Sequence, residues 1–146
     1  MSIIDKLKAF MDNNPARLKF GLNEIQEVSY GTTRVAFEIY SGPMSGCILK
    51  FARDGKMRSI NKAEVATWKM AEKKGKTEYF CPIVDHDAES YNWIIMERAN
   101  MNVSITERRE FRKEVEEEFP DQFIDFASCN IGRHEGDIKL VDYDWA

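Results

Sequence analysis

Three polar residues near the end of the sequence have the types and the spacing needed for phosphoryl transfer. Asp125 is followed five positions later by Asn130, and Asp142 comes after a short, mainly apolar stretch. An aspartate can accept the proton of an acceptor hydroxyl, and the oxygens of an asparagine and a second aspartate are ligands that suit Mg²⁺. The pattern predicts a general base at Asp125 and metal ligands at Asn130 and Asp142.

Each of these residues also has a purely structural interpretation. A loop aspartate such as Asp125 often caps a turn, and polar residues often flank a surface hairpin. We expect residues 131–141 to form such a hairpin, with its turn at Gly136-Asp137. That turn lies halfway between the two predicted metal ligands, so the hairpin would bring them together. Asp125 lies five residues before Asn130, as a catalytic base would. This spacing favours metal binding over a purely structural role for Asn130 and Asp142.

A lysine inside an apolar strand predicts a second part of the site. Lys50 lies within Cys47–Phe51, on the same strand face as Ile48. Such a lysine either extends from an edge strand into solvent or is held by an anionic partner. Glu64 follows fourteen residues later on a predicted helix. A lysine–glutamate pair of this kind directs the ammonium group towards the α- and β-phosphates of a nucleotide.

Two segments next to predicted strands could contact a nucleotide. The turn Gly31-Thr32-Thr33 could offer backbone amides and hydroxyls to phosphate oxygens, although its single glycine fits an ordinary β-turn equally well. The strand end at Met96, Glu97 and Ala99 could bind an adenine ring through backbone groups. The alternative there is a core strand with its exit loop.

The elements that must position these residues follow from apolar periodicity and turn residues. We expect helices over about Ser2–Asn13, Asn61–Lys74 and, from a capping box at Ser104–Glu107, to about Phe119. Strands are expected within Leu18–Tyr40 and at Cys47–Phe51, Phe80–Val84 and Trp93–Met96, before the terminal hairpin. The second helix should bury Ala63, Ala66, Thr67 and Met70 and end at Gly75. This order indicates an α+β fold.

Composition narrows the classes of function. The chain has 146 residues, enough for one domain, and a net charge of −4, which argues against nucleic acid or an anionic membrane as partner. No stretch approaches the length of a membrane span. Its three cysteines have no metal-binding spacing, so reduced thiols and a cytoplasmic location are expected.

With these residues in hand, the chain resembles the protein-kinase-like superfamily, closest to small-molecule phosphotransferases such as aminoglycoside and choline kinases and to phage- or bacterium-encoded kinase-like proteins. The matches, in order, are Gly31, Lys50, Glu64, Met96-Glu97-Arg98-Ala99, Asp125 with Asn130, and Asp142-Tyr143-Asp144. The resemblance implies a single domain over residues 1–146. It would have a five-stranded antiparallel small lobe with one main helix (1–99) and a strongly reduced large lobe (100–146). It also implies ATP and Mg²⁺ as cofactors.

The sequence departs from ordinary protein kinases at several positions. Phe123-Ile124 precedes the predicted base, and Ala127 stands where those kinases have a lysine that stabilises the transferring phosphate. The chain ends four residues after Asp142, without the segments that hold a peptide substrate.

Two hypotheses follow from the resemblance, and a third is an unrelated α+β domain whose motifs match those of kinases by coincidence. The first is an ATP- and Mg²⁺-dependent phosphotransferase in which Asp125 is the base and Lys50, paired with Glu64, holds phosphates. Asn130 and Asp142 hold the metal. The second is a catalytically inactive kinase-like binding protein, for instance a viral effector that inhibits a host protein in the host cytoplasm, with its contact surface on the N-terminal helix or the charged helix Ser104–Phe119. The acceptor is open in both, and a second copy could cover apolar surface in a homodimer.

Overall fold

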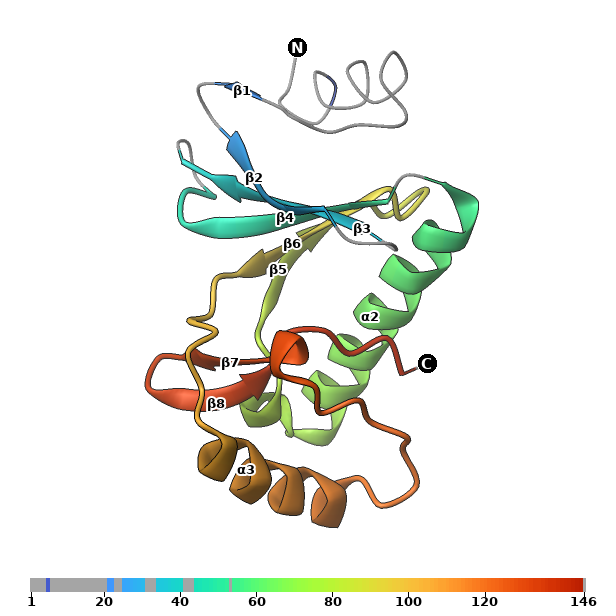
Figure 1. Cartoon of the computed structure of the whole chain (residues 1–146). Helices are drawn as coiled ribbons and strands as arrows, with labels where there is room; N and C mark the ends of the chain where they lie inside the picture. Colours follow the sequence, from blue (N-terminus) through green and yellow to red (C-terminus); the bar gives the residue numbers. More distant parts are fainter. Residues whose placement is uncertain are drawn as a thin grey trace. The chain divides into compact units, whose positions relative to one another are not determined.

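The computed structural model describes Asp5 and residues 21–22, 25–30, 34–40, 44–52 and 54–145, with only the backbone for 21–30 (Figure 1). Apart from Asp5, the predicted N-terminal helix lies outside these residues, as does the turn Gly31-Thr32-Thr33. The chain divides into two compact units. The first unit comprises Met1–Asn61 and Val84–Met96, and the second comprises Lys62–Ile83 and Glu97–Ala146. The predicted lobes divide the chain once, after residue 99, whereas each unit contains two stretches of sequence.

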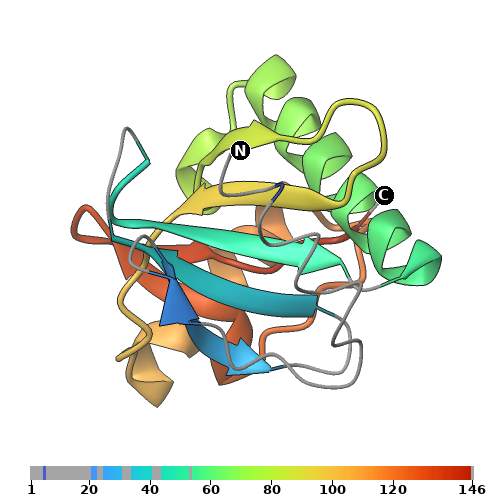
Figure 2. The same ribbon diagram turned by 90° about the horizontal axis from the view of Figure 1, so that it is seen from above.

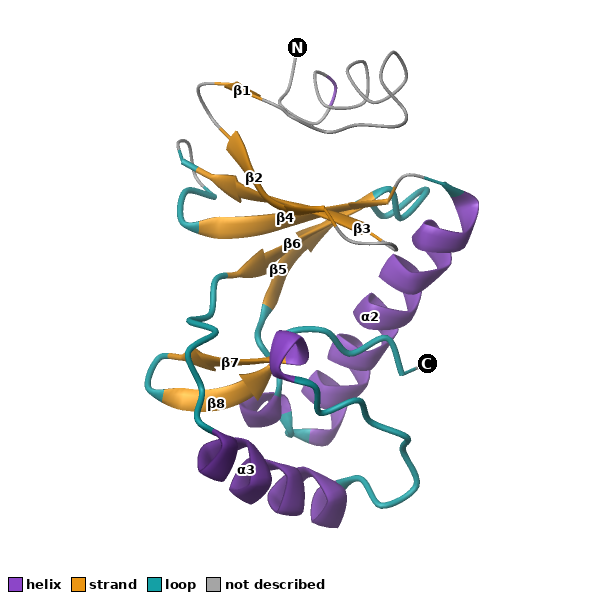
Figure 3. Ribbon diagram, viewed as in Figure 1, coloured by secondary structure: helices purple, strands orange, loops and turns teal. Residues whose placement is uncertain are grey.

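A largely antiparallel six-stranded sheet dominates the first unit (Figures 1 and 3). Its strands are β1 Gly21–Leu22, β2 Ile25–Tyr30, β3 Arg34–Ile39, β4 Cys47–Ala52, β5 Ile83–His86 and β6 Trp93–Glu97, in the order β1-β2-β3-β4-β6-β5. The α+β class is therefore confirmed, and among the described residues the sheet has six strands rather than the predicted five. The additional strand, β1, has only two residues, too few for periodicity to reveal.

The register of β3 and β4 separates the two faces of the sheet, and Figure 2 shows these strands side by side. Val35 pairs with Phe51 and Phe37 with Leu49, and all four side chains are buried in the core. The intervening pair, Ala36 and Lys50, lies on the opposite face. A strand is therefore present within Leu18–Tyr40, as predicted. The same register places Lys50 on the face of Ile48, as expected.

Helix α2 spans Gly55–Lys74 and begins six residues before the predicted start at Asn61. Asp54 explains the difference, because its carboxylate accepts a hydrogen bond from the backbone N–H of Met57 at 3.0 Å and so caps the first turn. Gly75, with φ of 67°, follows the helix as predicted.

The buried face of α2 differs in part from the predicted one, since Thr67 is buried as predicted but Ala63 and Met70 are only half-buried. Ala66 is exposed, and the fully enclosed side chains include Asn61, Glu64, Val65 and Ala71. Asn61 accepts a hydrogen bond from Arg34 at 3.0 Å and donates one to the backbone oxygen of Tyr91 at 2.8 Å. Apolar periodicity missed this face because two of its residues are polar and are buried only through such partners.

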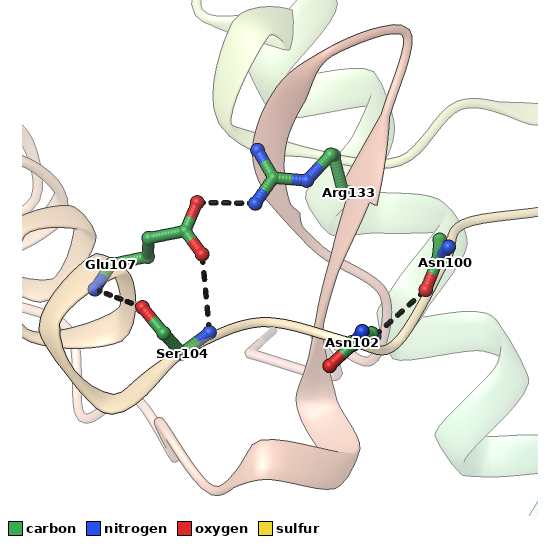
Figure 4. Close-up of polar contacts among 5 residues, drawn as sticks. All are labelled: Asn100, Asn102, Ser104, Glu107 and Arg133. Carbon is green, nitrogen blue, oxygen red and sulfur yellow. Dashed lines mark hydrogen bonds and ion pairs between the residues drawn. The ribbon is translucent and has the colours of Figure 1, made fainter.

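Helix α3 spans Ile105–Glu118 in the second unit and begins with the predicted capping box. The hydroxyl of Ser104 accepts from the N–H of Glu107 at 3.1 Å, and the Glu107 carboxylate accepts from the N–H of Ser104 at 3.2 Å. The same carboxylate pairs with Arg133 (Figure 4). Glu107 therefore links the start of α3 to the terminal hairpin.

That hairpin consists of β7 Ile131–His134 and β8 Asp137–Leu140. Its turn is Glu135-Gly136, one residue before the predicted Gly136-Asp137, and both turn residues have positive φ values of 51° and 86°. Two residues with positive φ form the turn that matches the twist of a tight hairpin. Short 3-10 helices lie at Thr77–Tyr79 and Ser128–Asn130. In the described part of the chain, no helix combines the length and the apolar character needed to cross a membrane.

Candidate functional site

The terminal hairpin brings the two predicted metal-binding segments together. Its ladder pairs Ile131 with Leu140, and one further backbone hydrogen bond, from the N–H of Val141 to the oxygen of Asn130 at 2.9 Å, extends the pairing. Asn130 therefore lies opposite Val141, and Asp142 is the next residue along. The prediction placed Asn130 opposite Asp142, so its register is wrong by one position, although the two segments are neighbours.

Asp125 lies beside Asn130 in the second unit. The side-chain amide of Asn130 donates to the backbone oxygen of Asp125 at 3.3 Å. The Asp125 carboxylate accepts the N–H of Ala127 through Oδ1 at 3.0 Å, which is the turn-capping role considered as the alternative. Its second oxygen, Oδ2, accepts no hydrogen bond from the described residues. Turn capping and a role as a base are therefore compatible.

The geometry of Asn130 suits a hard cation. Because its Nδ2 is directed to Asp125, the amide oxygen points the other way. That oxygen contacts only the thiol of Cys129, at 3.5 Å, within the described residues. A thiol is a weak donor that a cation can displace. Together with the carboxylate of Asp142, this oxygen supplies the kind of donor that Mg²⁺ takes from proteins.

Asp142 is half-buried, and the next residue, Tyr143, is completely buried. The backbone N–H of Tyr143 donates to Oε2 of Glu64 at 3.1 Å, and its hydroxyl donates to the backbone oxygen of Cys81 at 2.7 Å. Its ring meets Phe80 edge to face at 5.1 Å between centroids. Helix α2 is therefore tied to the segment that carries Asp142.

Neither the complete burial of Tyr143 nor its contact with Glu64 follows from the sequence pattern. Glu64 and Tyr143 are 79 positions apart, and no spacing rule connects them. One signal was present, since an aromatic residue between two aspartates near the end of the chain is a candidate for burial.

Lys50 and Glu64 belong to different units, so their pairing stays a prediction. Within the first unit, Lys50 is half-buried on β4, opposite Ala36. Arg34 and Glu38 occupy diagonal positions on the same face. Diagonal neighbours are within reach of long side chains, so Glu38 is a second candidate anion for Lys50.

The residues predicted to meet an adenine ring differ in what their backbone groups contact. The N–H of Glu97 donates to the oxygen of Pro82 at 2.9 Å, and the Glu97 oxygen accepts the thiol of Cys81 at 2.9 Å. Ala99 makes no backbone hydrogen bond to the described residues. Met96 is buried in the strand. Ala99 therefore offers the more available groups.

Asp125 also lines a surface hollow of about 580 Å³ in the second unit. Its other lining residues are Arg112, Phe123, Ile124, Phe126 and Ala127. The side chain of Phe123 is 96% exposed, and Arg112 lies over the ring of Phe126 at 5.3 Å. An acceptor molecule could reach the Asp125 carboxylate from this side.

A different group of potential ligands surrounds His134. One ligand atom each from Glu97, His134 and Glu135 lies within 4.8 Å of the others. However, Nδ1 of His134 lies 3.0 Å from the ammonium nitrogen of Lys139, and Nε2 lies 3.4 Å from the Glu97 carboxylate. Nδ1 must accept from Lys139, so Nε2 carries the proton that faces Glu97. Metal-bound histidines show the opposite pattern, in which the second nitrogen donates to an acceptor. We therefore interpret this group as a hydrogen-bonded chain.

No protein-family model matches this chain, and no curated protein sequence matches it either. Its function must therefore be argued from the residues and their geometry.

Proposed function

We propose that this chain is an ATP- and Mg²⁺-dependent phosphotransferase with a minimal kinase-like fold. The observation that carries the proposal is the connection among Asp125, Asn130 and Asp142. Asn130 is hydrogen-bonded to Asp125 through its side chain and to the residue before Asp142 through its backbone. Three residues selected for their chemistry are thus linked within one unit.

The proposed roles follow from the donor atoms. Asp125 accepts the proton of the acceptor hydroxyl through Oδ2 while Oδ1 keeps the turn closed. Asn130 and Asp142 hold Mg²⁺ with their oxygens. A Mg²⁺ ion held by these two residues would neutralise charge on the phosphates of the nucleotide. Lys50 is assigned to the phosphates of the nucleotide, and Ala99 to the adenine ring.

The order of elements supports the kinase-like part of the proposal. Lys50 lies on β4, and the next element along the chain is α2, which carries Glu64. Strand β6, which leads to the predicted adenine-binding residues, lies next to β4 in the sheet. The order of lysine, glutamate and hinge along the chain is the order found in kinase-like sites.

Calorimetric titration with ATP, with and without Mg²⁺, tests the proposal. We expect the wild-type protein to bind ATP more tightly with Mg²⁺, and Asp142→Ala to lose that enhancement because a ligand oxygen is removed. Asp137→Ala is the matched control, since Asp137 is an exposed aspartate of the same hairpin. Equal binding by the wild type and Asp142→Ala would show that the metal site is wrongly assigned.

A second function is favoured by two observations near Asp125. Its carboxylate already has a structural task in the turn, and the neighbouring Phe123 exposes almost its whole ring. Exposed aromatic side chains are frequent at protein interfaces. The second proposal is therefore a kinase-like binding protein without catalysis.

A further inference from the structure

The hollow beside Asp125 combines a positive group, a negative group and an apolar lining. Arg112 and Asp125 are its charged lining residues, and its volume of about 580 Å³ suits a small organic molecule. The other lining residues are Phe123, Ile124, Phe126 and Ala127. A ligand that matches this hollow therefore has an apolar body and two polar ends of different chemistry.

Arg112 presents a fixed guanidinium group to this hollow. Its Nε donates to the carboxylate of Glu116 at 2.5 Å, and its Cζ lies 5.3 Å from the centre of the Phe126 ring. No hydrogen bond from Nη1 or Nη2 is present among the described residues. These two groups are therefore open to a ligand, and the paired N–H groups of a guanidinium match the two oxygens of a carboxylate.

The charges around Arg112 favour a carboxylate over a phosphate. Arg108 precedes Arg112 by four positions and lies on the same side of α3. Its Nε is buried and has no hydrogen-bond partner among the described residues. Glu116 offsets one of these two positive charges. The remaining charge suits a carboxylate, whereas a phosphate monoester carries nearly two negative charges at neutral pH.

We propose that this hollow binds the acceptor of the phosphotransferase, and that the acceptor is a hydroxy acid with an apolar body. Arg112 binds the carboxylate, the exposed ring of Phe123 contacts the apolar body, and Oδ2 of Asp125 accepts a hydrogen bond from the hydroxyl. The proposal rests on the proposed function, because it uses Asp125 as the base.

The transfer to such an acceptor is an ordinary phosphoryl transfer. The hydroxyl oxygen forms a bond to the γ-phosphorus of ATP, the bond between that phosphorus and ADP breaks, and the proton passes to Asp125. Choline and aminoglycosides are cations, so the acceptor class differs from theirs. Its carboxylate end, held by Arg112, distinguishes it.

Calorimetric titration of the full chain without nucleotide tests the site with three probes that share a hydroxyphenyl ring. They are para-hydroxyphenylacetate with a carboxylate, tyrosol with a neutral alcohol and tyramine with an ammonium group. We expect para-hydroxyphenylacetate to bind about tenfold more tightly than tyrosol, and tyramine to bind most weakly. Tenfold corresponds to one charge-assisted hydrogen bond at the low end of its range, which applies because Arg112 is exposed.

Variants of α3 identify the group that recognises the carboxylate. Arg112→Gln should lower the affinity for para-hydroxyphenylacetate to that for tyrosol and leave tyrosol binding unchanged. Arg112→Lys keeps the charge but not the paired N–H groups, so its loss should be smaller. Arg109→Gln is the matched control, since Arg109 is an exposed arginine of α3 that does not line the hollow. Glu116→Gln removes an opposing charge and should not weaken binding.

Turnover tests the role as acceptor. The rate of ADP release from Mg–ATP should be higher with para-hydroxyphenylacetate than with phenylacetate, which has the same carboxylate but no hydroxyl. Equal rates with the two compounds would overturn the acceptor role.

The outcomes separate this proposal from the proposed function. In a protein that binds Mg–ATP, equal binding of the three probes, a preference for tyramine, or an Arg112→Gln variant that still prefers the carboxylate would overturn the acceptor class alone. Arg112-dependent binding of para-hydroxyphenylacetate by a protein that does not bind Mg–ATP would overturn the proposed function and the acceptor role, while the carboxylate site itself would stand.

Discussion

At the scale of single residues, the carboxylate of Glu107 accepts hydrogen bonds from both Ser104 and Arg133. Hydrogen bonds from Arg133 and from the backbone of Ser104 hold the pKa of Glu107 below its ordinary value. A carboxyl group with a lowered pKa stabilises the folded state above its unfolded pKa, and this contribution is lost as the pH falls through the folded one. The start of α3 should therefore loosen in acid.

We predict that Glu107→Gln is less stable than the wild type at neutral pH and that this difference shrinks as the pH falls. The decrease should begin near the ordinary glutamate pKa of about 4.5 and be complete below the lowered pKa of Glu107. Thermal melts between about pH 3 and 7 measure it. Glu110→Gln, an exposed position of the same helix, is the matched control. A pH-independent difference would mean that the charge of Glu107 is not what matters.

How far single residues can be predicted from sequence depends on whether their partners are local. The spacing of Asp125 and Asn130 was sufficient to predict that the two residues lie side by side. They are only five positions apart, and a hydrogen bond joins them. Glu64 and Tyr143 could not be paired, since their contact depends on how α2 and the end of the chain pack. Spacing rules predict contacts only between residues that are close in sequence, whereas burial depends on the whole fold.

At the scale of elements, some local signals predicted the boundaries of helices and turns correctly and others did not. The capping box of α3 was identified correctly, because its two hydrogen bonds involve residues three positions apart. The start of α2 was missed although Asp54 is a suitable cap, since the apolar pattern begins later. The hairpin turn was wrong by one residue because Glu135, a non-glycine residue, adopts positive φ.

Gly132 in β7 should tolerate no side chain. A Cβ atom there would lie 2.7 Å from the Cβ of Ala99 and 3.2 Å from the backbone oxygen of Asn100. Since Asn100 is also bonded to Arg133 in both directions, the neighbouring segment cannot easily retreat.

We predict that Gly132→Ala destabilises the protein by about 1–3 kcal/mol, as overpacking does. Urea unfolding should show a lower midpoint with an unchanged slope. Gly55→Ala is the control, because a Cβ atom there meets only the end of the flexible Arg58 side chain, at 3.3 Å. That substitution should be neutral or slightly stabilising, since alanine favours a helix. Equal effects of the two substitutions would contradict the packing argument.

At the scale of the whole molecule, the α+β class followed from the order of periodic segments, but the division into two units did not. The chain passes from one unit to the other three times, and one of these passages lies inside α2. The periodic pattern of a helix continues without a break even where successive turns belong to different units. Periodicity therefore cannot reveal such a boundary. Linker composition, the usual sign, is absent from a helix interior.

The two proposed functions differ in which part of the molecule must stay intact. A phosphotransferase depends on Asp125, while a binding protein that uses α3 depends on the exposed charges of that helix. Arg109 and Lys113 are exposed and lie four positions apart, so they share one side of α3. Reversing both charges changes that side without touching Asp125, Asn130 or Asp142.

We predict that Asp125→Asn lowers the turnover of Mg–ATP about 10²- to 10⁴-fold, the range for loss of a general base. Hydrolysis with water as acceptor measures it, so the natural acceptor need not be known. Asparagine can still accept the N–H of Ala127, which should preserve the turn and the affinity for Mg–ATP. Asp121→Asn, an exposed position of the same loop, and the double variant Arg109→Glu/Lys113→Glu should keep full turnover. Undiminished hydrolysis by Asp125→Asn would remove the base from the mechanism, and the exposed surfaces of α3 and Phe123 would then be the place to look for function.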